Sequence, residues 1–126
     1  MNFLRLFANW DDVHEFEPDS VIFSDTDTAD AVYVVLDGTV ELRLRGEPLC
    51  EEGKGSILGE LALSGSPHRS AVATARTPVR LARLERDRFE SMIGRHPEFA
   101  LHVMSALANR LRSVDSFIST HIGKTD

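Results

Sequence analysis

The sequence contains little of what several common classes of protein require. Its 126 residues include one cysteine, Cys50, which excludes an internal disulfide and favours a reducing, cytoplasmic compartment. No apolar run approaches the roughly 20 residues that a membrane-spanning helix needs. The acidic pair Asp11 and Asp12 interrupts the N-terminal apolar segment too early for a signal peptide. We therefore expect a soluble protein without a membrane partner.

The residue patterns of two common enzyme classes are also missing. The five histidines are scattered, and no two lie one residue apart on a strand, as a cupin-type metal site requires. No Gly-x-Ser-x-Gly segment is present to carry a nucleophilic serine. We accordingly expect no catalytic residues, no metal site and no cofactor.

Charge is distributed unevenly along the chain, whose net charge is −6. Residues 1–60 contain 4 Lys and Arg against 14 Asp and Glu, whereas residues 61–126 contain 10 against 6. The acidic first half argues against direct binding of nucleic acid or anionic membranes, which attract basic surfaces. The positive second half has the sign that an anionic ligand needs.

The length fits one domain, residues 1–126, and leaves little room for a second. Residues 3–13 have apolar side chains at helical spacing and predict a short helix. From about residue 15 to 85, segments rich in β-branched and aromatic residues alternate with turn residues, which is typical of a sandwich or closed roll. Asp37-Gly38 is the strongest hairpin signal, and a further strand pair is expected about Thr77-Pro78.

The last third changes to helical periodicity, over about residues 86–120. One helix is expected to end at Gly94, and Pro97 suits the first turn of a longer one. One face of the long helix has the coiled-coil spacing of a homodimer seam: Ala100, Met104, Leu107, Leu111, Val114 and Ile118. A second apolar face can pack on the roll: Phe99, Val103, Ala106 and Phe117. A broad monomer core that uses both faces is the alternative.

The most informative stretch is Gly59-Glu60-Leu61-Ala62-Leu63, followed by Pro67 and by Arg69-Ser70-Ala71. Gly59 allows close approach of the backbone to a ligand, and the residues after it suit a helical turn whose free N–H groups bind an anion. The planar guanidinium of Arg69 suits a phosphate. Glu60 would accept hydrogen bonds from a neutral sugar hydroxyl. A surface ion pair between Glu60 and Arg69 is the alternative.

This spaced set resembles the phosphate-binding cassette of cyclic nucleotide-binding domains, and the resemblance extends over roughly residues 7–118. It implies a mainly β fold, a jelly-roll (double-stranded β-helix) with a short N-terminal helix and two C-terminal helices, the last long. In that family the arginine pairs with the cyclic phosphate and the glutamate holds the ribose 2′-hydroxyl. The resemblance gives these roles to Arg69 and Glu60, and adds Ser70 and the N–H groups near Gly59, Leu61 and Ala62 to the phosphate site.

The resemblance also gives the long helix a role. In bacterial cyclic-AMP receptor proteins this helix forms the dimer seam and caps the purine base. Arg110 falls on an arginine of that family, whereas Val114 and Asp115 stand at the two hydroxyl residues that touch the base. Val114 and Asp115 are therefore a possible base cap with different chemistry. The expected ligand is cyclic AMP or cyclic GMP, with the choice between them open.

The function implied is that of a non-catalytic sensor domain that couples a cyclic mononucleotide to movement of its C-terminal helix. Two alternatives stay open. One is a degenerate β-roll that serves as a dimerisation or interaction module and binds no nucleotide. The other is the sensor fragment of a larger transcription regulator, because such regulators continue from the long helix into a helix-turn-helix domain.

Overall fold

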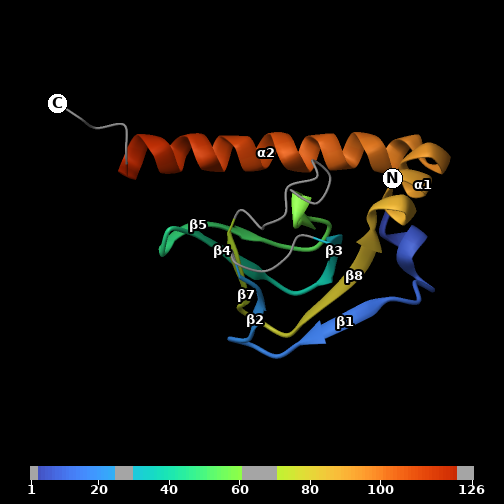
Figure 1. The fold of residues 1–126 in the computed structure, drawn as a ribbon, viewed down its shortest axis with the longest axis horizontal. Helices are drawn as coiled ribbons and strands as arrows, with labels where there is room; N and C mark the ends of the chain where they lie inside the picture. The colour runs from blue at the N-terminus through green and yellow to red at the C-terminus, as the bar shows by residue number, and fades with distance from the viewer. Residues whose placement is uncertain (1–2, 25–29, 61–70, 122–126) are drawn as a thin grey trace.

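A computed structural model describes residues 3–24, 30–60 and 71–121. Two four-stranded antiparallel sheets form a roll, with the strand orders β1-β8-β3-β6 and β2-β7-β4-β5. A long helix lies along one side of this roll (Figure 1). The expected mainly β roll with two C-terminal helices, the last long, is confirmed.

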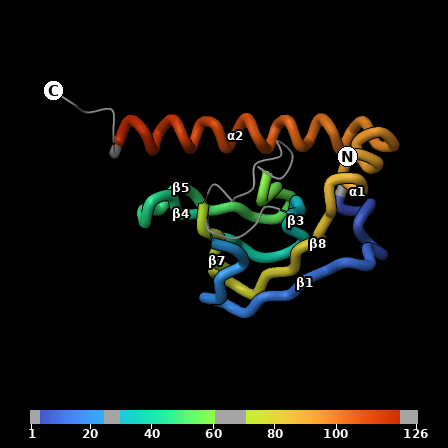
Figure 2. Tube along the Cα trace, viewed as in Figure 1, coloured from blue at the N-terminus to red at the C-terminus, as the bar shows by residue number. Residues whose placement is uncertain are grey.

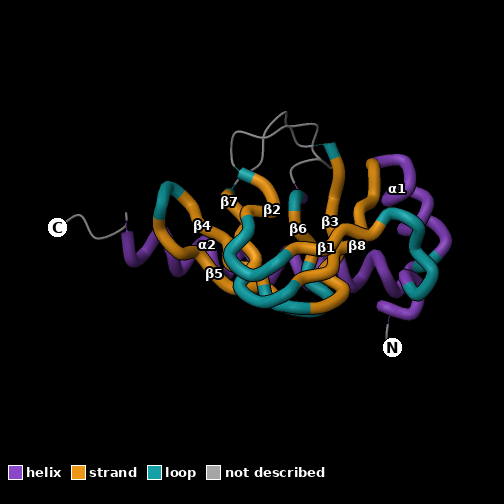
Figure 3. Tube along the Cα trace, turned by 90° about the horizontal axis from the view of Figure 1, so that it is seen from below, coloured by secondary structure: helices purple, strands orange, loops and turns teal. Residues whose placement is uncertain are grey.

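The first sheet consists of β1 (Val13–Phe16), β8 (Val79–Glu85), β3 (Ala31–Asp37) and β6 (Ile57–Leu58). The second consists of β2 (Val21–Phe23), β7 (Val72–Ala75), β4 (Val40–Leu44) and β5 (Glu47–Glu52). The helical elements are the 3₁₀ helix η1 (Phe3–Phe7), α1 (Arg86–Arg95) and α2 (Pro97–His121). Figure 3 shows α2 running along the length of the roll, behind the strands.

The central strands of the first sheet, β3 and β8, have buried side chains on both faces, since successive side chains of a strand point to opposite sides. In β8, Ala82 and Leu84 face a core beneath the helices. Val79 and Leu81 of the same strand face the interior of the roll. The helical core contains an aromatic cluster in which the ring of Phe99 lies 5.8 Å from those of both Phe7 and Phe89. This cluster joins η1, α1 and the first turn of α2 at one end of the roll (Figure 2).

The turn at Asp37-Gly38 is not a hairpin, so that expectation from the sequence was wrong. β3 pairs with β6 and β8, whereas β4 pairs with β5 and β7, and the turn therefore carries the chain from one sheet to the other. Gly38 has φ +95°, a conformation that favours glycine. A Cβ at this position would also collide with the carbonyl oxygen of Pro78.

The turn at Thr77-Pro78 also crosses between the sheets. β7 and β8 were expected to pair, but β7 lies in the second sheet and β8 in the first. The backbone N–H of Thr39 donates to Thr77 Oγ1 at 2.9 Å, so the two crossing turns are in direct contact. The tight hairpin joins β4 to β5 instead, through Arg45 and Gly46, which have φ 54° and 81°.

Two helix boundaries also differ from the expectation. The N-terminal helix ends at Phe7, because Val13 already pairs with Ala82 at the edge of the first sheet. Helix α1 does not end at Gly94 but continues to Arg95. The His96 N–H donates to the Met92 carbonyl at 2.9 Å, and this bond closes the last turn. Helix α2 begins at Pro97, as expected.

The two apolar faces of α2 have different environments. Phe99, Val103 and Phe117 are buried, and Ala106 packs against the core, so the expected packing of this face on the roll is confirmed. Half of the predicted seam is uncovered in the single chain, where Met104, Leu111 and Ile118 are 59%, 69% and 43% exposed. The other three residues, Ala100, Leu107 and Val114, are partly buried. Across the described ranges, no helix combines the length and apolarity needed to cross a bilayer.

Candidate functional site

The predicted phosphate and ribose residues fall partly within the described ranges. Gly59 and Glu60 are described, whereas Leu61, Ala62, Arg69 and Ser70 lie outside them. Gly59 follows β6 and has φ +75°, which an L side chain rarely adopts. Glu60 follows it directly and is the last described residue of this stretch. The backbone at Gly59 thus has a conformation that favours glycine, and the convergence of Glu60 and Arg69 stays a prediction.

Glu60 is held by an arginine from the long helix. Arg110 is 8% exposed, and its Nη1 donates to Glu60 Oε1 at 3.3 Å. Its Nε donates to Glu52 Oε2 at 3.1 Å, and its Nη2 to the Ile57 carbonyl at 2.7 Å. Each nitrogen of the guanidinium therefore reaches a different acceptor, and the three acceptors span β5, β6 and the turn after β6. A buried charge of this kind needs such partners, because desolvation of an unpaired guanidinium is costly.

Glu52, the last residue of β5, receives two further hydrogen bonds. Ser56 Oγ donates to Glu52 Oε1 at 2.7 Å, and Cys50 Sγ donates to Glu52 Oε2 at 3.3 Å. Burial, followed by the hydrogen bond to Glu52, raises the pKa of the Cys50 thiol to about 12. The thiol therefore stays protonated near neutral pH, in keeping with a small strand side chain rather than a nucleophile.

A second contact joins α2 to the same segment. His102 Nε2 lies 2.6 Å from the carbonyl oxygen of Gly55, and since a carbonyl only accepts, the histidine nitrogen donates. His102 precedes Arg110 by about two helical turns. Helix α2 is thus attached to residues 52–60 at two separate points.

The two candidate base-cap residues lie just beyond Arg110 on α2. Val114 is partly buried and Asp115 is exposed. They follow Arg110 by four and five residues, so both are about one turn further along the helix. Their contact with a base stays a prediction.

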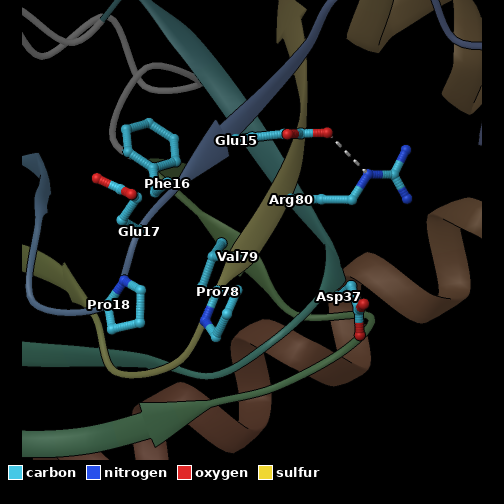
Figure 4. A pocket seen from close by; sticks show the side chains of 8 residues that line it. All are labelled: Glu15, Phe16, Glu17, Pro18, Asp37, Pro78, Val79 and Arg80. Atoms are coloured by element: carbon cyan, nitrogen blue, oxygen red, sulfur yellow. Dashed lines mark ion pairs between the residues drawn. The ribbon is translucent and has the colours of Figure 1, made fainter.

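A hollow of about 590 Å³ lies elsewhere on the roll, where β1, the end of β3 and the start of β8 meet (Figure 4). Its rim includes Glu15, Asp37 and Arg80, and Arg80 Nε lies 3.7 Å from Glu15 Oε2. None of its lining residues belongs to the phosphate-binding stretch or to the network around Arg110. Among the described residues, no group of three or more His, Cys, Asp or Glu is placed to hold a metal ion.

Sequence reasoning missed the network of Glu52, Arg110 and Glu60. Arg110 had been matched to a family arginine, but its partners were not foreseen. One signal was available in the sequence, because Arg110 lies seven residues from both Val103 and Phe117, two members of the apolar face predicted to pack on the roll. The structure buries all three side chains. An arginine in the middle of a buried apolar row indicates a paired charge.

Comparison with known proteins identifies the class to which this fold and this glycine–glutamate turn belong. The family described as "Cyclic nucleotide-binding domain" matches residues 13–96, which is two thirds of the chain. The chain therefore belongs to the cyclic nucleotide-binding domain family.

Individual relatives are larger proteins of different kinds. The chain is 31% identical over 111 residues to "Lysophospholipase NTE1" of Chaetomium globosum, covering 84% of this chain and 7% of that protein. It is 27% identical over 107 residues to the "CRP-like cAMP-activated global transcriptional regulator" of Mycobacterium tuberculosis, covering 81% and 48%. The crystal structure of the Thermus thermophilus catabolite activator protein matches with a TM-score of 0.67 and 31% identity, over 86% of this chain and 53% of that one. The chain thus spans half or less of the curated relatives it matches here.

Proposed function

We propose that this chain is a non-catalytic sensor domain for a cyclic mononucleotide, either cyclic AMP or cyclic GMP. The observation that supports this most directly is Glu60, which follows the left-handed Gly59 and is held by the buried Arg110. Arg69 neutralises the cyclic phosphate. The Ser70 hydroxyl and the N–H groups near Gly59, Leu61 and Ala62 donate to the phosphate oxygens.

In this proposal Glu60 recognises the ribose by accepting a hydrogen bond from it. Its Oε1 accepts from Arg110, but a carboxylate has about four lone-pair sites and can also accept from a ribose 2′-hydroxyl. A 2′-deoxy sugar would leave the carboxylate short of one donor, and the loss of such a partner is costly in a partly buried site.

Val114 and Asp115 close over the base. Val114 supplies packing, and the Asp115 carboxylate accepts from the adenine amino group or from guanine N1–H and N2. Both bases offer such donors, so the chemistry of this cap leaves cyclic AMP and cyclic GMP as the two candidate ligands.

In this proposal, α2 transmits the effect of ligand binding away from the site. Because Arg110 contacts Glu60 directly, a ribose hydroxyl that donates to Glu60 changes the hydrogen bonding of Arg110 at the middle of the helix. Coupling of this kind requires the ligand to prefer one placement of α2 over another.

The partner of α2 is a second copy of the chain, through the seam of Ala100, Met104, Leu107, Leu111, Val114 and Ile118. The exposure of Met104, Leu111 and Ile118 at seven-residue intervals supports a coiled-coil contact. Sedimentation equilibrium of the unaltered protein tests this, and a monomer at all concentrations would refute the homodimer. We expect no direct contact with nucleic acid or membrane, and a cytoplasmic location.

Calorimetric titration with cyclic AMP, cyclic GMP and the matching linear monophosphates tests the proposed function. We expect binding of a cyclic form only. Arg69→Ala should weaken that binding by on the order of 2–5 kcal/mol, because the phosphate loses its charged partner. Arg76→Ala, at an exposed position seven residues on, is the matched control and should leave affinity unchanged.

Unchanged affinity in Arg69→Ala would show that the phosphate assignment is wrong. Hydrolysis of any ligand would point to an enzyme. No binding of any of the four nucleotides would favour the degenerate dimerisation module, an alternative that the altered cap at Val114 and Asp115 keeps open.

A further inference from the structure

Glu52 has no part in the proposed contacts to the nucleotide, yet three donors converge on its carboxylate. Arg110 Nε lies 3.1 Å from Oε2, Ser56 Oγ lies 2.7 Å from Oε1, and Cys50 Sγ lies 3.3 Å from Oε2. The side chain of Glu52 is 19% exposed. A carboxylate with this number of ordered donors, mostly withdrawn from water, is fixed in place.

We propose that Glu52 is a positioning residue for the nucleotide site, acting through Arg110 on Glu60. Glu52 fixes the guanidinium so that its Nη1 meets Glu60, and Arg110 in turn holds the carboxylate that binds the ribose. The role in ribose binding rests on the proposed function, whereas the positioning of Glu60 rests on the geometry of the network alone.

The shape of the guanidinium supports this direction of action. Its five N–H donors lie in one plane at fixed angles. Once Nε is bonded to Glu52 and Nη2 to the Ile57 carbonyl, the direction of Nη1 is determined. The contact of Nη1 with Glu60, at 3.3 Å, is the longest of the three. The orientation of the Arg110 guanidinium is therefore fixed mainly by its partners on β5 and β6, and the Glu60 side chain takes the position that this orientation allows.

Two substitutions separate positioning from charge. Glu52→Ala removes the acceptor and the charge together, and leaves Nε without its partner. Glu52→Gln removes the charge but keeps an oxygen that can accept from Nε, and its amide can donate to Ser56. A positioning role predicts that glutamine rescues what alanine loses, whereas a role of charge alone predicts that both fail equally. Glu51→Ala, at the exposed neighbouring carboxylate of β5, is the matched control.

The experiment measures affinity for the cyclic nucleotide that the unaltered protein prefers and for its 2′-deoxy analogue. The quantity compared is the ratio of the two affinities, which a general weakening of the fold would not change. In Glu52→Ala we expect this ratio to fall by about 2- to 10-fold, the range of one net hydrogen bond. Affinity for the deoxy analogue should change little. In Glu52→Gln and Glu51→Ala the ratio should stay close to that of the unaltered protein.

An unchanged ratio in Glu52→Ala, or an equal loss in Glu52→Gln, would overturn the inference. If the unaltered protein binds neither nucleotide, the proposed function fails, and a second measurement decides on Glu52. This measurement compares the melting temperatures of Glu52→Ala, Glu60→Ala and the variant that carries both changes. The three variants are made twice, once in the unaltered protein and once in the Arg110→Met protein. When Arg110 is present, the shift of the melting temperature in the double variant should differ from the sum of the two single shifts. In the Arg110→Met protein it should equal that sum. Additive shifts in both backgrounds would show that Glu52 does not act on Glu60.

Discussion

The first turn of α2 and its middle are held on the roll by different kinds of contact. The first turn inserts Phe99 into an aromatic cluster with Phe7 and Phe89, where apolar burial provides the stability. The middle of the helix inserts Arg110, whose guanidinium donates hydrogen bonds to Glu52, Glu60 and a carbonyl group.

This difference indicates which part of α2 a ligand can influence. Apolar packing at Phe99 does not depend on the charge of a distant group. The hydrogen bonds of Arg110 depend directly on what else binds Glu60. We therefore expect the first turn to act as a constant attachment and the middle of the helix to respond to occupancy of the site.

Phe99→Ala should have the largest effect, since Phe99 is fully buried and its truncation leaves a cavity in the core. Large-to-small changes of this kind cost about 3–5 kcal/mol of unfolding free energy, measurable by urea denaturation. Leu101→Ala, two residues on and 65% exposed, is the control and should lose far less. Equal losses in both would contradict the assignment of Phe99 as the main attachment.

Arg110→Met should have an intermediate effect. It keeps the length of the side chain but leaves the carboxylates of Glu52 and Glu60 without their shared cation. Breaking a buried pair costs about 3–5 kcal/mol, and with both carboxylates about one-fifth exposed we expect roughly 2 kcal/mol. Arg112→Met, at an exposed position on the same helix, is the matched control. A loss no greater than that of Arg112→Met would show that the polar contact contributes little.

Leu111→Asp should have the smallest effect on the stability of the single chain, because Leu111 is 69% exposed. Its expected effect is on association, since a charge in the proposed seam opposes contact between two helices. Sedimentation should show a monomer for the variant and a dimer for the unaltered protein. Thr120→Asp, exposed near the end of α2, is the control and should leave the dimer intact.

Much of the fold could be predicted because its signals are local. Alternating apolar residues mark β4, and Pro97 marks the start of α2. The pairing of strands could not be predicted in the same way. Asp37-Gly38 has the composition of a hairpin turn, but a left-handed glycine is equally suited to a crossing between sheets, and only tertiary contacts with Pro78 distinguish the two.

The same distinction between local and long-range signals applies to the candidate site. Gly59 and Glu60 belong to a spaced motif within one short stretch, which a sequence displays directly. Glu52 and Arg110 lie on different elements far apart in the chain, and their pairing follows from how α2 packs on β5 and β6. The sequence places Arg110 between Val103 and Phe117 on one face of the helix, but it does not show which carboxylates lie opposite.

The contact between the two crossing turns has a consequence for how this chain folds. Gly38 and Pro78 belong to turns separated by much of the chain, and each turn joins both sheets. Both sheets therefore pair strands that are far apart in the sequence, and closing the long loop between the turns adds an entropic barrier. A chain rich in such non-local pairings has a high contact order, and we expect it to fold more slowly than a helical domain of the same length.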